Sequence, residues 1–206
     1  MSLEAQPLLD VHDVLEADRK RTLVFVYGTL KTGLYNYTMY LKPAIELDKA
    51  SFVAAARTSK EEFHMVLDDQ AFYPCLYRAP KDEGYRVLGE VYSVEDDTLA
   101  ALDVLEEVDD DLYARDEIDV DLLDGERKGE TVSSLVYLMP VIEDLPRLER
   151  ITNYTTAMNA KYDELMGDPQ LEILECIYGK EVTQAVESKV KEGIEFADAW
   201  KLVVEA

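Results

Sequence analysis

Cysteine and histidine are scarce in this chain of 206 residues. The two cysteines, Cys75 and Cys176, lie far apart and form no CxxC motif, so neither a disulfide framework nor a cysteine-ligated metal site is predicted. A reducing, cytoplasmic environment is the better expectation. The two histidines, His12 and His64, belong to no cluster of metal ligands, and His64 is expected to be structural.

Basic residues and long apolar runs are also few. Lys and Arg number 21 against 44 Asp and Glu, which gives a net charge of −23. Nucleic acid and anionic membrane surfaces are therefore excluded as partners, because phosphate binding needs clusters of Lys and Arg. The apolar stretch 131–142 is too short to cross a bilayer. Residues 1–21 lack the apolar segment of a signal peptide, so we expect a soluble protein.

The length suits one domain with an appendage. We expect a polar N-terminal arm over residues 1–21, a β-rich domain over 22–144, and a helical extension over 145–206 that packs on it. Because the strands do not alternate with helices, the fold class is α+β or a small mixed barrel with flanking helices, and not a parallel βαβ sheet.

The strands are predicted from short apolar runs and alternating patterns, and the helices from apolar stripes. Expected strands cover 23–26, 50–57, 63–67, 73–77, 85–94, 113–122 and 131–139. The segment 50–57 also fits a helix, and its partial alternation favours the strand. The segment 73–77 contains Pro74 and is confined to a sheet edge or an irregular piece. Expected helices cover 35–41, 97–107, 145–166, 169–178 and 180–205, and Asp96 or Asp97 is the expected N-cap of the second.

The stretch Thr22–Asn36 organises the chain. Its apolar run Leu23–Val26 predicts a strand buried on both faces. The strand ends at Tyr27-Gly28-Thr29-Leu30, where Gly28 permits backbone conformations that other residues resist. Adjacent N–H groups in such a loop can hold a carboxylate or an oxyanion. The alternative is that Gly28 only makes a tight turn.

Glu106 is the candidate acid–base residue. On the helix expected over 97–107 it shares a face with Leu99 and Leu102, whereas Glu107 points away. Burial, the negative end of the helix dipole and neighbouring carboxylates should all raise the pKa of Glu106 toward the range of a general base near neutral pH. The alternative is that Glu106 only ends an amphipathic helix, with its carboxylate in water.

Two groups of motifs resemble the signatures of the γ-glutamylcyclotransferase-like family, particularly its γ-glutamylamine cyclotransferases. The first is Val26-Tyr-Gly-Thr-Leu-Lys-x-Gly33, followed by Asn36. The second comprises Gly89-Glu-Val-Tyr-x-Val94, Leu102-Asp-x-x-Glu106 and Leu112-Tyr-x-Arg115. The resemblance covers roughly residues 23–139. One departure is Glu107, which stands where the family often has Gly after its catalytic Glu.

The resemblance implies a small mixed barrel flanked by helices and an activity of the transferase or lyase type. The α-amine of a γ-glutamyl amine or γ-glutamyl amino acid would attack its own side-chain carbonyl, releasing 5-oxoproline and a free amine without metal or cofactor. Glu106 would be the catalytic acid–base. The substrate would be bound by Tyr27, Gly28, Thr29, Leu30, Tyr113 and Tyr137.

Several alternatives stay open. Tyr113 and Tyr137 fit core packing as well as substrate binding. Cys75 has no evident base beside it, and the neighbouring pair Tyr73-Pro74 is a further candidate for the pocket wall. The whole chain fits a catalytically inactive relative that binds a ligand or a protein, or an enzyme acting on a γ-glutamyl group of a larger intermediate. The sequence leaves a homodimer open, and it does not identify the leaving amine.

Overall fold

The computed structural model describes residues 20–110, 112–141 and 145–204. The predicted polar arm therefore lies almost wholly outside the described residues, as does the side chain of Cys176. The strands are β1 (Arg21–Val26), β2 (Ala50–Thr58), β3 (Phe63–Leu67), β4 (Pro74–Arg78), β5 (Leu88–Glu95), β6 (Ala114–Leu122), β7 (Thr131–Leu138) and β8 (Glu149–Ile151). The helices are η1 (Tyr37–Leu41), α2 (Lys42–Glu46), α3 (Asp96–Leu105), η2 (Val108–Asp110), η3 (Leu145–Arg147), α4 (Thr156–Met166), α5 (Pro169–Tyr178), α6 (Lys180–Lys191) and α7 (Phe196–Val204).

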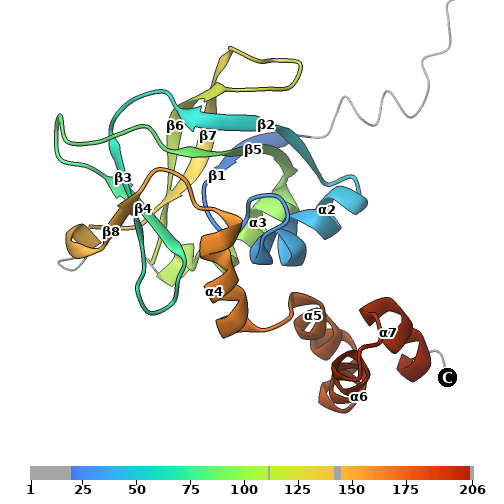
Figure 1. Cartoon of the computed structure of the whole chain (residues 1–206). Coiled ribbons are helices and arrows are strands. Elements are labelled where there is room, and N and C mark those ends of the chain that lie inside the picture. The colour runs from blue at the N-terminus through green and yellow to red at the C-terminus, as the bar shows by residue number, and fades with distance from the viewer. Residues whose placement is uncertain (1–19, 111, 142–144, 205–206) are drawn as a thin grey trace, which may run out of the picture.

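Five strands close into a barrel in the order β1-β5-β2-β6-β7 (Figure 1). All neighbouring pairs are antiparallel except β1 and β7, which are parallel and close the barrel. A second sheet has the order β4-β3-β8, so the strand that contains Pro74 is an edge strand, as predicted. The α+β class and the mixed barrel with flanking helices are confirmed.

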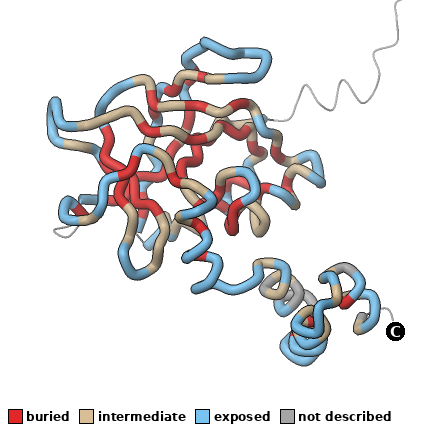
Figure 2. Tube along the Cα trace, in the orientation of Figure 1, coloured by how far each residue is buried: buried red, intermediate tan, exposed pale blue. Residues whose placement is uncertain are grey.

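The alternation of side chains explains why β1 is buried on both faces. Phe25 and Tyr27 belong to a core cluster shared with Val91 of β5. Val24 and Val26 belong to a second cluster, which includes Leu102 of α3. Buried residues concentrate in the barrel and the elements against it, whereas the C-terminal helices are mostly exposed (Figure 2).

Gly89 allows β1 and β5 to approach each other closely. A Cβ at Gly89 would lie 2.4 Å from the carbonyl oxygen of Val26 and 2.6 Å from the ring of Phe25. Real Cβ atoms do not approach backbone this closely, so the position excludes every side chain. This close contact fixes the C-terminal end of β1, and the candidate functional site lies at that end.

Three predictions of helical structure are wrong. The helix expected over residues 145–166 begins only at Thr156, because the chain first forms β8, which pairs with β3 through Ile151 and Met65. The helix expected over 180–205 is broken at Gly193, whose φ of 88° is left-handed. The N-cap of α3 is Glu95, not Asp96 or Asp97.

The segment expected as a helix over residues 35–41 is helical, but Tyr37–Leu41 forms a π-helical turn that continues into α2. In the C-terminal part, α5 contacts η1, and α5–α7 lie beyond α4 (Figure 1). They surround a small core of their own around Val186 and Ala199. We propose that α4 joins this helical unit to the barrel and that the barrel domain extends to β8.

Candidate active site

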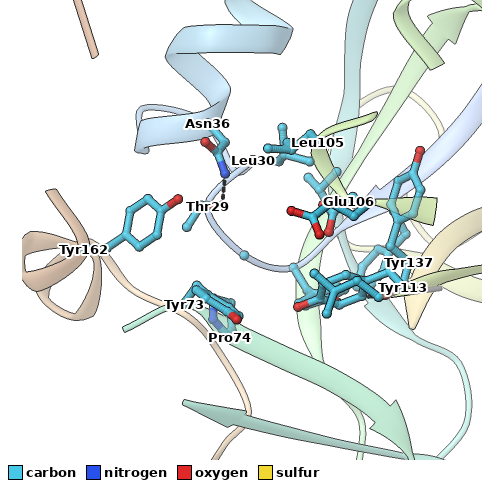
Figure 3. Close-up of a pocket in the computed structure, with 16 residues that line it drawn as sticks. Thr29, Leu30, Asn36, Tyr73, Pro74, Leu105, Glu106, Tyr113, Tyr137 and Tyr162 are labelled. Atoms are coloured by element: carbon cyan, nitrogen blue, oxygen red, sulfur yellow. Dashed lines mark hydrogen bonds between the residues drawn. The ribbon is translucent and has the colours of Figure 1, made fainter. Parts of the chain in front are cut away.

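A cavity of about 250 Å³ opens at the end of β1 (Figure 3). Its walls come from β1 and the loop after it, the start of β4, the end of α3, β7 and α4. The lining residues are Phe25, Val26, Tyr27, Gly28, Thr29, Leu30, Asn36, Tyr73, Pro74, Leu105, Glu106, Glu107, Leu112, Tyr113, Tyr137 and Tyr162. All seven predicted site residues are among them, so segments far apart in sequence meet at one cavity.

Glu106 projects its carboxylate into this cavity from the C-terminal end of α3 (Figure 3). Its backbone is the C-cap of that helix, and its N–H donates to the carbonyl of Leu102 at 3.0 Å. Burial raises the pKa of Glu106 from 4.5 to about 7, because the charged form loses hydration. Of the three causes expected from the sequence, burial is the one that acts here.

Glu107 occupies a position whose backbone favours glycine. Its φ is 50°, in the left-handed region, and its carbonyl accepts from the N–H groups of Asp110 and Leu112 at 3.1 and 3.2 Å. The sharp turn after α3 is therefore kept without a glycine, at a cost of about 1 kcal/mol. The Glu107 side chain is exposed, as predicted, and lies on the rim of the cavity.

The loop Gly28–Leu30 borders the same cavity (Figure 3). Within the described part of the chain, no acceptor binds the backbone N–H groups of Gly28, Thr29 and Leu30. The loop is held from the other side, since the Asn36 amide donates to Thr29 Oγ1 at 2.8 Å and the Tyr37 N–H to the Thr29 carbonyl at 3.1 Å. These N–H groups can therefore serve as donors to an anionic group in the cavity.

The reason for the glycine at Gly28 differs from the one expected. Gly28 is not in the left-handed region. A Cβ there would lie 2.7 Å from Cγ of Pro74, so it is the close packing of β4 that requires glycine. The same contact places Tyr73 and Pro74 in the cavity wall, as the sequence had suggested for this pair.

The three predicted tyrosines make different contacts. Tyr27 donates its hydroxyl to the carbonyl of Tyr137 at 2.9 Å, and burial raises its pKa. The Tyr113 hydroxyl donates a long hydrogen bond to the Cys75 sulfur at 4.0 Å, and burial raises the pKa of Tyr113, so the hydroxyl stays protonated. The Tyr137 hydroxyl donates to Asp103 at 2.8 Å, which leaves its ring rather than its hydroxyl to border the cavity.

Cys75 and His64 are buried, and neither lines the cavity. Burial raises the pKa of the Cys75 thiol to about 12, so it is protonated at neutral pH and a poor nucleophile. His64 Nε2 lies 2.7 Å from the Glu83 carbonyl oxygen, the structural role expected for it. In the described segments, no group of three His, Cys, Asp or Glu residues is arranged to hold a metal ion.

Sequence reasoning missed Asn36 as the support of the loop, Leu112 as a wall residue, and Tyr162 as a contributor from α4. Asn36 and Leu112 belong to the motifs that resemble the family signatures, so membership of these motifs was the signal that could have identified them. Tyr162 gave no signal, because it is far from every motif.

None of the helices in the described ranges is long and apolar enough to span a membrane.

Residues 24–156 match the sequence model of a protein family described as gamma-glutamyl cyclotransferase, AIG2-like. Gamma-glutamylaminecyclotransferase B of Danio rerio is 38% identical over 115 residues, which is 56% of this chain and 58% of that protein. Gamma-glutamylaminecyclotransferase A of the same organism is 38% identical over 114 residues, 55% of this chain and 66% of that protein. The chain thus spans less than two thirds of the length of these two relatives.

Among solved structures, the crystal structure of an AIG2-like protein from Mus musculus has a similar fold. It aligns with a TM-score of 0.57 at 29% sequence identity, over 66% of this chain and 88% of the other. The matched family region includes the loop Gly28–Leu30, Glu106, Tyr113 and Tyr137 and ends at Thr156, at the start of α4.

Proposed function

The chain belongs to the family described as gamma-glutamyl cyclotransferase, AIG2-like, and from this premise we propose that it releases 5-oxoproline and a free amine from a small γ-glutamyl compound. The observation that carries the proposal is the position of Glu106. Its carboxylate has a raised pKa and faces the cavity that is also lined by residues Gly28–Leu30.

The reaction is intramolecular. The α-amino nitrogen of the γ-glutamyl group forms a bond to its own side-chain carbonyl carbon, and the bond from that carbon to the leaving nitrogen breaks. The nucleophile is tethered, so holding the chain in a folded conformation lowers the barrier. A cavity of about 250 Å³ suits a compact, folded substrate.

Glu106 would carry the protons between the two nitrogens. The α-ammonium loses two protons on becoming the ring N–H, and the leaving nitrogen gains two on leaving as an ammonium. Glu106 would transfer these protons one at a time, accepting each as a carboxylate and donating it as an acid. A pKa of about 7 suits both roles near neutral pH, because neither form is rare. Glu106 is thereby returned to its carboxylate form, and no proton is gained or lost overall.

Negative charge on the substrate would be met by backbone and hydroxyl donors. No Lys or Arg is among the lining residues, so the N–H groups of Gly28–Leu30 are the candidates for binding the developing oxyanion. The Tyr113 hydroxyl is a further neutral donor, because its only protein acceptor among the described residues is the Cys75 sulfur, a weak acceptor 4.0 Å away. Tyr27 and Tyr137 would shape the wall, since their hydroxyls are already engaged with protein acceptors.

The direct test is a substrate panel. Purified protein is incubated with γ-glutamyl amines and γ-glutamyl dipeptides, and 5-oxoproline and the freed amine are measured together by mass spectrometry. We expect the two products in equal amounts from at least one class. If no substrate yields 5-oxoproline while some bind, the chain is instead an inactive relative that acts as a binding module.

A further inference from the structure

Tyr162 belongs to the cavity although it lies outside the matched family region. That region ends at residue 156, six positions earlier in α4. Most of α4 is exposed, but Tyr162 is only 8% exposed, because its ring enters the cavity wall. The ring also meets Tyr35 edge-on, with 5.5 Å between the centroids. A side chain of the C-terminal extension thus completes a site otherwise built from the barrel domain.

Contacts hold α4 and the segment just before it against two parts of the cavity wall, the loop after β1 and the segment before β4. Lys31, in the loop after β1, donates to Asn153 Oδ1 and to the Tyr154 carbonyl, both at 2.7 Å. The Tyr154 hydroxyl donates to the Phe72 carbonyl at 2.9 Å. The ammonium of Lys161 lies 5.2 Å from the centre of the Phe72 ring. Tyr162 is therefore a positioned part of the wall rather than a residue on a loose appendage.

The location of Tyr162 relative to Glu106 decides which part of a substrate it meets. Figure 3 shows Glu106 and Tyr162 on opposite sides of the loop that contains Thr29 and Leu30. Cyclisation folds the γ-glutamyl part into a five-membered ring beside Glu106. The group that extends away from the reacting carbonyl is then the leaving amine, and the wall opposite Glu106 limits its size.

We propose that Tyr162 closes the end of the cavity that receives the leaving amine and so restricts which amines are released. This inference rests on the proposed cyclotransferase function. Tyr162 would be a specificity-determining residue and not a catalytic one, because it takes no part in proton transfer. Shortening its side chain should enlarge the leaving-amine site and leave the chemistry at Glu106 intact.

The test compares leaving amines of different size in the full chain. The γ-glutamyl derivatives of methylamine and of a bulky amine, benzylamine, are assayed for 5-oxoproline release. For Tyr162→Ala we expect the ratio of kcat/KM for benzylamine to that for methylamine to rise about tenfold, the scale of discrimination by an apolar pocket. Tyr162→Trp enlarges the side chain and should lower the same ratio, which keeps the test valid if Tyr162→Ala fails to fold.

Leu165→Ala is the matched control, because Leu165 is on the same helix, is 57% exposed and does not line the cavity. It should leave the ratio unchanged. An unchanged ratio in both Tyr162 variants, or an equal loss with both substrates, would overturn the role of Tyr162 while the cyclotransferase function stands. A wild-type protein that releases no 5-oxoproline from any substrate overturns the function itself, and this inference with it.

Discussion

At the scale of single residues, the defining feature is Glu106, whose carboxyl group has a pKa of about 7. It faces a cavity that has no Lys or Arg among its lining residues. Its usual pKa is 4.5, so the folded protein holds the proton more tightly than the unfolded chain does. Folding stability is therefore lost as pH rises from about 4.5 to 7, and the full cost applies above 7. The shift corresponds to about 3 kcal/mol.

Removal of this charge should stabilise the protein at high pH. We expect Glu106→Gln to raise the free energy of unfolding relative to wild type by up to about 3 kcal/mol at pH 8 and by much less at pH 5. Urea unfolding at both pH values measures the difference. Glu107→Gln is the control on the exposed neighbouring residue. A gain that is equal at both pH values would contradict a buried Glu106 carboxylate.

The sequence predicted the position of Glu106 in the cavity because the signal for it is local. Its spacing from Leu99 and Leu102 places it on the buried face of one helix, and helical periodicity does not depend on the rest of the fold. Tyr162 could not be predicted in this way. It enters the cavity only because Lys31 and Phe72 hold the segment around Tyr154, and such contacts are not visible in a linear pattern.

At the scale of elements, the site depends on how closely β4 packs against the loop after β1. The sequence indicated that Gly28 mattered and that Pro74 lay on an edge, but it did not relate the two. The missing side chain at Gly28 leaves room for the Pro74 ring. Likewise, β8 was missed because a three-residue strand is defined by its partner, β3, and not by its own composition.

Gly28→Ala should therefore act through Pro74. We expect a loss of about 1–3 kcal/mol in stability, typical of overpacking, because the new methyl would lie 2.7 Å from Cγ of Pro74. The double variant Gly28→Ala with Pro74→Ala should recover part of that loss. Thermal unfolding of the two single variants and the double variant measures the coupling. Strict additivity would show that the two residues are not in contact.

At the scale of the whole molecule, the barrel and α5–α7 have separate apolar cores, which are connected by α4 and by the contact of α5 with η1. Alternating and apolar segments predicted the barrel strands, and apolar stripes predicted most of the helices. The separation of the cores did not follow from the sequence, because composition hardly changes between the two regions. We propose that the helical unit unfolds locally without opening the cavity.

Val186→Ala tests this independence. Val186 is fully buried in α6, so its truncation should destabilise the helical unit by about 2 kcal/mol. Hydrogen exchange followed by mass spectrometry should show faster exchange in α6 and α7 and unchanged protection in β1–β7. Gln184→Ala, on the exposed side of α6, is the control. Faster exchange throughout the barrel would mean that the chain unfolds as one unit.

The pH dependence of kcat in wild type and Glu106→Gln tests the central role of Glu106 most directly. With a γ-glutamyl substrate that wild type turns over, kcat should rise with pH and level off above about 7, because the carboxylate is the form that removes the proton. Glu106→Gln should be slower by a factor of about 10²–10⁴ and should lose this inflection. A Glu106→Gln variant that keeps the wild-type rate and pH profile would contradict the assignment.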